Sequence, residues 1–293
     1  MSIPINSLCV ECHFRKRLSL ARQLGDEDQA MEYAHKIMHQ LLKAPPEMDS
    51  TWLGAIGDRL MQEIYGLDPD RLKAEKEFSN RFVLDRLDSI QKKIDEAADP
   101  VYAALQFAVL GNYLDFSALQ GEVSFEQLEQ MLADAALLDL DKECYRQFCN
   151  DLATKTKLLY ITDNAGEIVF DRLLAQELQK KYPHLEITFC VRGSAVSNDA
   201  TRKDAEEAGI PFPVIDNGTA IGGTVLRFVG EELKNAMDDA DVIIAKGMGN
   251  TESLFGCDYN VYYAFLVKCE RFIQVFNKPK LTPMFITEPA SRR

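Results

Sequence analysis

Hydrophobic residues recur every three or four positions through the first half of the chain, which is the period of one helix face. One such stripe contains Ala30, Tyr33, Ile37 and Leu41, and it stops before Pro45, where a helix is expected to end. The same periodicity predicts helices at about 18–24, 30–42, 50–65, 70–95, 100–112 and 124–135. We therefore expect residues 1–155 to form a helical domain.

From about Lys157 the pattern changes to short β-branched and aromatic runs that alternate with helical stretches. The runs predict strands at 158–162, 187–191, 213–215, 242–245, 261–267 and 272–276. Helical patterns lie between them at 168–182, 201–208, 224–238 and 251–256. This alternation is typical of α/β folds, so we predict a doubly wound, mostly parallel sheet (α/β/α) over residues 156–293.

The charge of the chain narrows the classes of partner. The chain has 33 Lys and Arg residues and 46 Asp and Glu residues, which gives a net charge of −13. Nucleic acid is therefore not an expected partner.

The longest apolar run, at 261–267, is far shorter than the roughly 20 residues that cross a bilayer. The N-terminus lacks a secretory pattern, and we expect no membrane partner and a cytoplasmic location.

Polar clusters follow three of the predicted strands. They read DNAGE at 163–167, RGSAVSNDAT at 192–201 and KGMGNTE at 246–252. Because the carboxyl ends of parallel strands share one edge of a sheet, and ligands bind there, we expect the clusters to meet. Taken singly, each cluster is better explained by helix capping or a turn.

Together the clusters suit a phosphate held by a divalent metal. Asp163, Asn164 and Asp199 offer oxygen ligands of the kind that Mg²⁺ and Mn²⁺ prefer. Lys246 would neutralise charge on the transferring phosphoryl group, and Gly247 would let the backbone approach it closely. The predicted reaction is hydrolysis of a phosphate ester.

Several further residues have two open interpretations. Arg192 either pairs with the substrate phosphate or holds a local carboxylate, and Glu167 is either a general base or a plain first-turn helix acid. Asn112 and Asp115 either close over the site from the helical half or simply end a helix. The amides of Asn198 and Asn250 are candidate contacts to substrate or phosphate.

These clusters, with GNYLDF at 111–116 and CVEC at 9–12, resemble the damage-control phosphatase family, formerly domain of unknown function 89. The resemblance implies a helical domain on an α/β/α domain and a metal-dependent phosphatase. The implied substrates are small phosphorylated metabolites, including sugar phosphates and damaged cofactor precursors. It also implies that Asp163, Asn164 and Asp199 bind Mn²⁺, Mg²⁺, Co²⁺ or Ni²⁺, and that Lys246 is the family's lysine.

Two other functions compete with this one. An S-adenosylmethionine-dependent carboxyl methyltransferase would use the same sheet edge, but the first strand-to-helix turn has a single glycine, Gly166, where nucleoside-binding turns usually have several. A non-catalytic sensor of phosphorylated metabolites would share the pocket. Neither the substrate nor the oligomeric state follows from the sequence.

The cysteines and histidines give weaker signals. Seven scattered cysteines are expected to be thiols in a reducing cytosol. Cys9 and Cys12 form a CxxC pair that is best explained as buried thiols, with a zinc site shared with Cys144 and Cys149, or a redox pair, as the alternatives. Two histidines, 35 and 39, have the spacing of a metal pair, but no motif surrounds them, and a helix surface is the better explanation.

Overall fold

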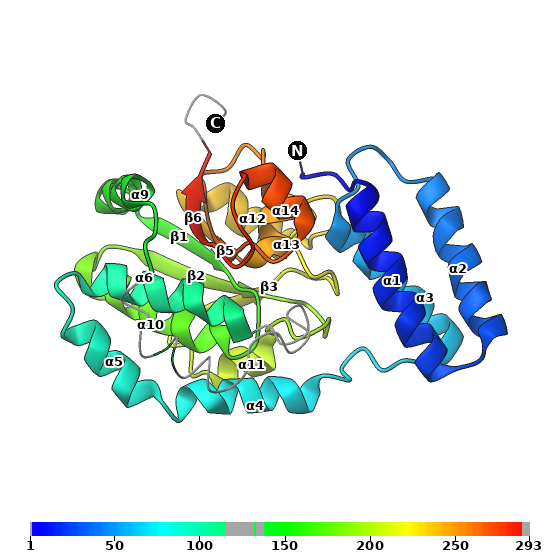
Figure 1. Ribbon diagram of the computed structural model, residues 1–293. Coiled ribbons are helices and arrows are strands. Elements are labelled where there is room, and N and C mark those ends of the chain that lie inside the picture. The colour runs from blue at the N-terminus through cyan, green and yellow to red at the C-terminus, as the bar shows by residue number, and fades with distance from the viewer. Residues whose placement is uncertain (1, 115–129, 131, 133–137, 289–293) are drawn as a thin grey trace.

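The computed structural model describes residues 2–114, 130, 132 and 138–288 (Figure 1). The helices of the first half are α1 (Ser7–Leu24), α2 (Glu27–Leu42), α3 (Ser50–Tyr65), α4 (Lys73–Leu84), α5 (Leu87–Asp95), α6 (Pro100–Leu110), the 3-10 turn η1 (Gly111–Leu114) and α9 (Lys142–Thr154). Four of them begin at an aspartate cap, because Asp26, Asp49, Asp99 and Asp141 accept bonds from first-turn N–H groups of α2, α3, α6 and α9. None of the helices in the described ranges is long and apolar enough to cross a membrane.

The second half forms a six-stranded sheet with the strand order β3-β2-β1-β4-β5-β6. Its strands are β1 (Lys157–Ile161), β2 (Glu186–Val191), β3 (Val214–Asp216), β4 (Val242–Lys246), β5 (Val261–Leu266) and β6 (Pro283–Thr287). The helices between and after them are α10 (Glu167–Lys181), α11 (Arg202–Glu207), α12 (Glu231–Asp239), α13 (Gly247–Leu254) and α14 (Glu270–Phe276). Strands β1 to β5 are parallel and β6 is antiparallel to β5. The strand order reverses between β1 and β4, so the carboxyl ends of these two strands mark the switch point where ligands bind in such sheets.

The sheet is buried on both faces. Leu158 and Tyr160 of β1 lie in the core shared with α6 and α10, whereas Leu159 and Ile161 lie in the core shared with α12 and α14. This alternation follows from the two-residue period of a strand. Helices α4, α5 and α9 also contribute to the first of these cores.

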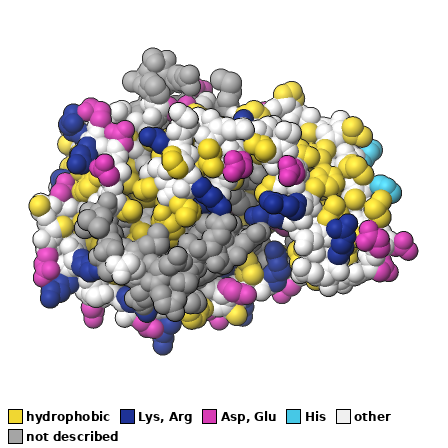
Figure 2. All heavy atoms as spheres, viewed as in Figure 1, with side chains coloured by type: hydrophobic (Ala, Val, Ile, Leu, Met, Phe, Trp, Pro, Cys, Tyr) yellow, Lys and Arg dark blue, Asp and Glu magenta, His cyan; other side chains and the backbone are white. Residues whose placement is uncertain are grey.

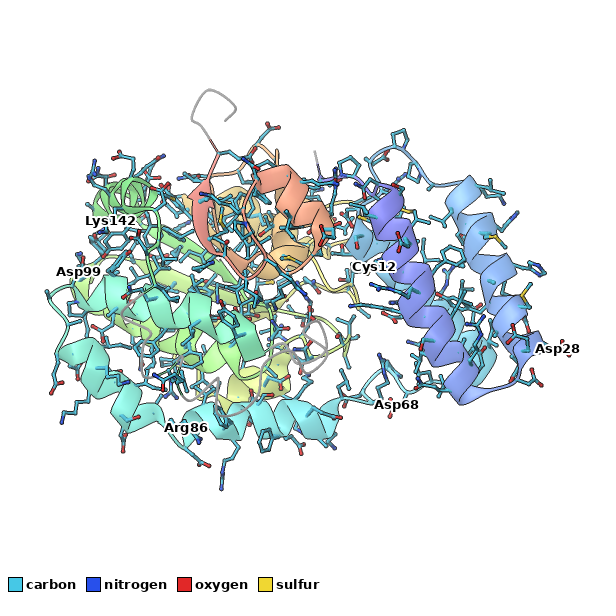
Figure 3. The ribbon with its side chains drawn as sticks, viewed as in Figure 1. Cys12, Asp28, Asp68, Arg86, Asp99 and Lys142 are labelled. Atoms are coloured by element: carbon cyan, nitrogen blue, oxygen red, sulfur yellow. The ribbon has the colours of Figure 1, made fainter. Side chains whose placement is uncertain are left out.

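Helices α1, α2 and α3 form a separate unit beside the sheet, at the right of Figure 1. Their apolar side chains make a small core of their own. The unit, which we call the α1–α3 unit, continues into α4 through a segment that contains Asp68 (Figure 3). It also contacts the sheet region through Glu252 of α13, whose backbone oxygen accepts from Ile3 N–H at 2.8 Å and whose Oε1 accepts from Ser50 N–H at 2.7 Å.

The predicted fold class is confirmed. A mostly helical N-terminal region precedes a mostly parallel α/β sheet, and the first five predicted strands correspond to β1–β5. Strands β1, β4 and β5 were recognisable because they are buried on both faces and are rich in β-branched and aromatic residues.

Other predicted elements differ from the structure. The strand predicted at 272–276 is wrong, because these residues form α14, in which Phe272 and Phe276 lie one turn apart and both pack against Phe265. The last strand is instead β6, which the sequence did not indicate. The helix predicted at 70–95 is two helices, α4 and α5, and the helices predicted at 224–238 and 251–256 begin at Glu231 and Gly247. The helix predicted at 124–135 lies outside the described residues, except for positions 130 and 132.

Candidate active site

The loops that follow β1 and β2 are joined at the carboxyl edge of the sheet. Ala200 N–H donates to the backbone oxygen of Asp163 at 2.7 Å, and Asn164 and Asp199 form an isolated antiparallel bridge. Because these contacts fix both loops, the side chains of Asp163, Asn164 and Asp199 line the same cleft.

The loop after β4 meets the same place through Gly247. This residue has a φ of +77°, a backbone conformation that residues other than glycine rarely adopt. A Cβ at this position would lie 1.9 Å from Oδ2 of Asp163. The backbone of the third cluster is therefore packed directly against the carboxylate of the first.

A buried amide network orients Asn164. Its Nδ2 donates to Oδ2 of Asp163 at 2.7 Å and to Oε2 of Glu167 at 2.8 Å, and Nδ2 of Asn112 donates to the same two oxygens at 3.0 Å each. Oδ1 of Asn112 accepts from Leu266 N–H at 3.3 Å. Since the amide nitrogen of Asn164 is committed to the protein, its amide oxygen is left for the cleft.

Two acidic side chains at the cleft share one guanidinium group. Arg192 Nε donates to Oδ2 of Asp199 at 2.6 Å, and its Nη2 lies 3.7 Å from Oδ1 of Asp163 without a hydrogen-bond partner. Burial, followed by the charges of Asp199 and Glu167, raises the pKa of Asp163 well above its usual range. A cation bound next to Asp163 would restore its ionised form.

Asn250 holds the Arg192 guanidinium group in place from the buried side of the cleft. Its Oδ1 accepts from Nη1 of Arg192 at 3.0 Å and from the hydroxyl of Thr224 at 2.9 Å. Its Nδ2 donates to the backbone oxygens of Thr162 and Lys246 at 2.9 and 2.7 Å. The Asn250 side chain therefore ties the ends of β1 and β4 to Arg192.

Lys246 lies in a buried ion network behind the cleft. Its Nζ donates to Oε1 of Glu167 at 2.6 Å, to Oδ1 of Asp171 at 2.7 Å and to the backbone oxygen of Ala108 at 2.8 Å, and its side chain is 0% exposed. Burial opposes the charged amine, but the Asp171 and Glu167 carboxylates outweigh it and raise the pKa of Lys246. Burial raises the pKa of Asp171 to about 7, and this carboxylate also accepts from the hydroxyl of Tyr160 at 2.8 Å.

The cleft itself has a volume of about 260 Å³ and lies between the sheet edge and the α1–α3 unit. The sheet edge lines it with Asp163, Asn164, Val196, Ser197, Asn198, Asp199, Gly222, Met248, Gly249 and Lys268. The α1–α3 unit lines it with Lys16, Thr51, Gly54, Ala55 and Asp58.

The residues expected from the sequence thus fall into two groups. Asp163, Asn164, Asn198 and Asp199 line the cleft, whereas a second group lies behind it and holds the first in place. That second group consists of Asn112, Glu167, Arg192, Lys246, Gly247 and Asn250. Asp115 lies outside the described residues.

The sequence analysis did not single out Lys268, which lines the cleft two residues after the end of β5. Its positive charge favours the ionised form of Asp163. The signal that would have revealed Lys268 is its position, because it follows the predicted strand 261–267 at the same edge of the sheet. The wall formed by α1 and α3 has no comparable signal, because it depends on tertiary packing alone.

The donors at the cleft fit a hard divalent cation. Two carboxylates and one amide oxygen face it, and oxygen ligands of this kind suit Mg²⁺ or Mn²⁺, which keep other positions for water and phosphate. Among the described residues, no three His, Cys, Asp or Glu side chains are grouped to hold a metal ion. An ion bound by Asp163, Asn164 and Asp199 would therefore take its remaining ligands from solvent and substrate.

The other metal candidates are not supported by the described structure. The cysteines at 9, 12, 144 and 149 are free thiols, and no grouping of three or more potential ligands includes them or the histidines at 35 and 39. Cys12 lies on α1, on the side that faces the sheet (Figure 3).

Several known proteins are similar to this chain in sequence. A protein from Methanocaldococcus jannaschii, described as uncharacterized, is 32% identical over 92% of this chain and 90% of its own length. Damage-control phosphatases from Pyrococcus horikoshii and Archaeoglobus fulgidus are 34% and 27% identical, over 60% and 92% of this chain and 61% and 93% of their own lengths.

The fold also matches a crystal structure of a DUF89 family protein from Pyrococcus horikoshii. The TM-score is 0.81 at 24% identity, over 98% of this chain and 99% of that one. The family model described as the damage-control phosphatase ARMT1-like domain matches residues 5–281. This chain belongs to the damage-control phosphatase ARMT1-like family.

Proposed function

We propose that this chain is a metal-dependent phosphatase that releases inorganic phosphate from small phosphorylated metabolites. The observation that carries the proposal is the convergence of Asp163, Asn164 and Asp199 on one cleft at the switch point of the sheet, with Lys268 beside them. The names of the two damage-control phosphatases among its relatives favour damaged metabolites as the substrate class.

In this proposal Asp163, Asn164 and Asp199 hold a divalent cation such as Mn²⁺, Mg²⁺, Co²⁺ or Ni²⁺. When bound, such a cation polarises a phosphoryl oxygen and lowers the pKa of a bound water. Lys268 binds the phosphate, because it is the cation of the sheet edge that lines the cleft next to Asp163.

The buried residues have a different part in the proposal. Glu167 holds the amides of Asn112 and Asn164, and Lys246 holds Glu167, so both act as positioning residues. Arg192 keeps Asp199 oriented and places a free N–H group beside Asp163. Such support commonly changes metal affinity or activity by about 10- to 100-fold when it is removed.

The test is phosphate release by the purified chain after chelator treatment, with each of the four metals added back. Substrates are p-nitrophenyl phosphate, sugar phosphates and pantetheine phosphate. We expect turnover only with added metal, and we expect Asp163→Asn and Asp199→Ala to reduce it by more than about 100-fold.

Asp139→Asn, at an exposed aspartate, is the matched control, and we expect it to retain full activity. Undiminished turnover in both cleft variants would remove the proposed centre. Substrate binding with no phosphate release under any metal would favour a metabolite sensor.

A further inference from the structure

One wall of the cleft comes from the α1–α3 unit and carries none of the residues that we place around the metal. It consists of Lys16 on α1 and of Thr51, Gly54, Ala55 and Asp58 on α3. The wall therefore faces the part of a bound substrate that points away from the scissile phosphate.

The charges on this wall leave one cation without a partner. Arg17 donates to Oδ1 of Asp58 at 2.8 Å and to the backbone oxygen of Gly54 at 3.0 Å, so those two charges neutralise each other. Lys16 is exposed and has no carboxylate partner among the described residues. It lies one turn after Cys12 on α1 and lines the cleft opposite residues of the sheet edge. Figure 2 shows Lys and Arg side chains over α1 and beside its seam with the rest of the molecule.

The wall is also held at a fixed place. The first backbone N–H of α3, at Ser50, donates to the buried carboxylate of Glu252, which belongs to the helix that follows Lys246. Gly223 approaches so closely that a Cβ there would lie 2.7 Å from the backbone oxygen of Gly249 and 2.8 Å from Thr51. Lys16 is therefore presented to the cleft by a docked helix and not by a free loop.

The lining also limits what kind of substrate fits. No aromatic side chain is found among the described residues that line the cleft, so a nucleobase would have no stacking partner there. The volume of about 260 Å³ is below the usual range for drug-sized ligands. A small, non-aromatic phosphate ester matches both features.

We propose that Lys16 binds a second anionic group of the substrate, so that the enzyme prefers small, non-aromatic phosphate esters that carry another phosphate or a carboxylate. This inference rests on the proposed function, since it describes the substrate of the same cleft. Lys268 and the metal site receive the scissile phosphate, and Lys16 receives the anionic group at the other end. Lys16 is then a specificity-determining residue.

The experiment compares three probes that differ at the far end: fructose 1,6-bisphosphate, 6-phosphogluconate and fructose 6-phosphate. Binding is measured by calorimetry with the Mn²⁺-loaded chain, and kcat/KM is measured for phosphate release. We expect Lys16→Ala to weaken binding and kcat/KM about tenfold for the first two probes, as expected for loss of one exposed charge-assisted contact. The change for fructose 6-phosphate is expected to stay below about twofold. Fructose 1,6-bisphosphate and 6-phosphogluconate separate a phosphate from a carboxylate as the second group.

Arg15→Ala is the matched control, because it removes the same charge from the same helix at an exposed position that does not line the cleft. We expect it to leave all three probes unchanged. Equal effects of Lys16→Ala on all three probes, or no preference of the wild type for the doubly anionic ones, would overturn the assignment. If no phosphate is released from any probe but the binding preference and its loss in Lys16→Ala persist, the proposed function fails while the role of Lys16 stands.

Discussion

At the scale of single residues, the side chains that line the cleft are oriented by buried side chains behind it. Asn164 presents its oxygen because Asp163 and Glu167 occupy its nitrogen, and Glu167 is in turn held by Lys246. Lys246 shares the two-residue alternation of β4 with Ile244, which points into the core formed with α6 and α10. That alternation explains why the lysine lies behind the metal candidates and not among them.

Gly247→Ala tests how tightly the third loop is packed against Asp163. The new Cβ would meet the Asp163 carboxylate at 1.9 Å, so we expect the carboxylate to shift and phosphate release to fall about 100-fold. Gly66→Ala is the control, because Gly66 also has a positive φ of 64° but has nothing within 4 Å of an added Cβ. Both variants should lose about 1–2 kcal/mol of stability from backbone strain alone. Similar activity of the two variants would show that the contact with Asp163 does not matter.

Lys246→Met tests the buried ion network. The substitution leaves the carboxylates of Glu167 and Asp171 without their cation, and breaking a buried pair in this way costs about 3–5 kcal/mol. We expect urea denaturation to show a loss of that size. Adding Glu167→Gln and Asp171→Asn removes the uncompensated charges, so the triple variant should regain part of the stability. A single variant as stable as the wild type would contradict the network.

At the scale of elements, the sequence predicted those strands, helices and strand-end residues that depend on the local pattern of apolar residues. Asp163, Asp199 and Lys246 were singled out because each lies at or beyond the carboxyl end of a buried strand, and the carboxyl ends of parallel strands meet. The helix α14 was missed because a run of five residues with two phenylalanines fits a strand as well as one helical face. The contribution of Lys16 to the cleft depends on how α1 packs against the rest of the protein, and local sequence patterns do not predict such tertiary packing.

The docking of α3 on α13 should depend on pH through Glu252. Burial, with a smaller contribution from Asp49, raises the pKa of Glu252 from its ordinary 4.5 to about 8. Between these two values the folded chain binds this proton more tightly than the unfolded chain. The stability that the protonated carboxyl contributes is therefore complete below pH 4.5 and is lost as the pH rises toward 8.

Glu252→Gln keeps a neutral side chain at every pH, so we expect it to flatten the fall of unfolding free energy between pH 5 and 8. One carboxyl contributes at most about 1.4 kcal/mol per pH unit to this slope. Part of the slope should remain, because the pKa of Asp171 is also raised, to about 7. Urea denaturation at each pH measures the effect, with Glu186→Gln at an exposed position as the control. Identical slopes in Glu252→Gln and the wild type would rule out this role.

At the scale of the whole molecule, the cleft lies between the sheet and the α1–α3 unit. The sheet has a large hydrophobic core on each face, one shared with α4, α5, α6, α9 and α10 and one with α12, α13 and α14, whereas the α1–α3 unit has only a small core of its own. The metal candidates belong to the sheet, whereas Lys16 and Thr51 belong to the α1–α3 unit. A substrate that contacts both walls would therefore link the two units, and its binding energy would add to their docking.

Hydrogen exchange can measure the difference in local stability between the α1–α3 unit and the sheet. Segments with few buried apolar contacts open more often, so we expect amides of α1 and α2 to exchange about 100-fold faster than those of β1 and β4. Mn²⁺ with inorganic phosphate should slow exchange in the loops after β1 and β2, and Mn²⁺ with fructose 1,6-bisphosphate should also slow it in α1 and α3. Asp163→Asn should abolish both ligand effects while leaving the difference between the two units unchanged. Equal exchange in α1 and β4 of the free chain would instead mean that the α1–α3 unit and the sheet unfold together, and the cleft would then lie within a single cooperative unit.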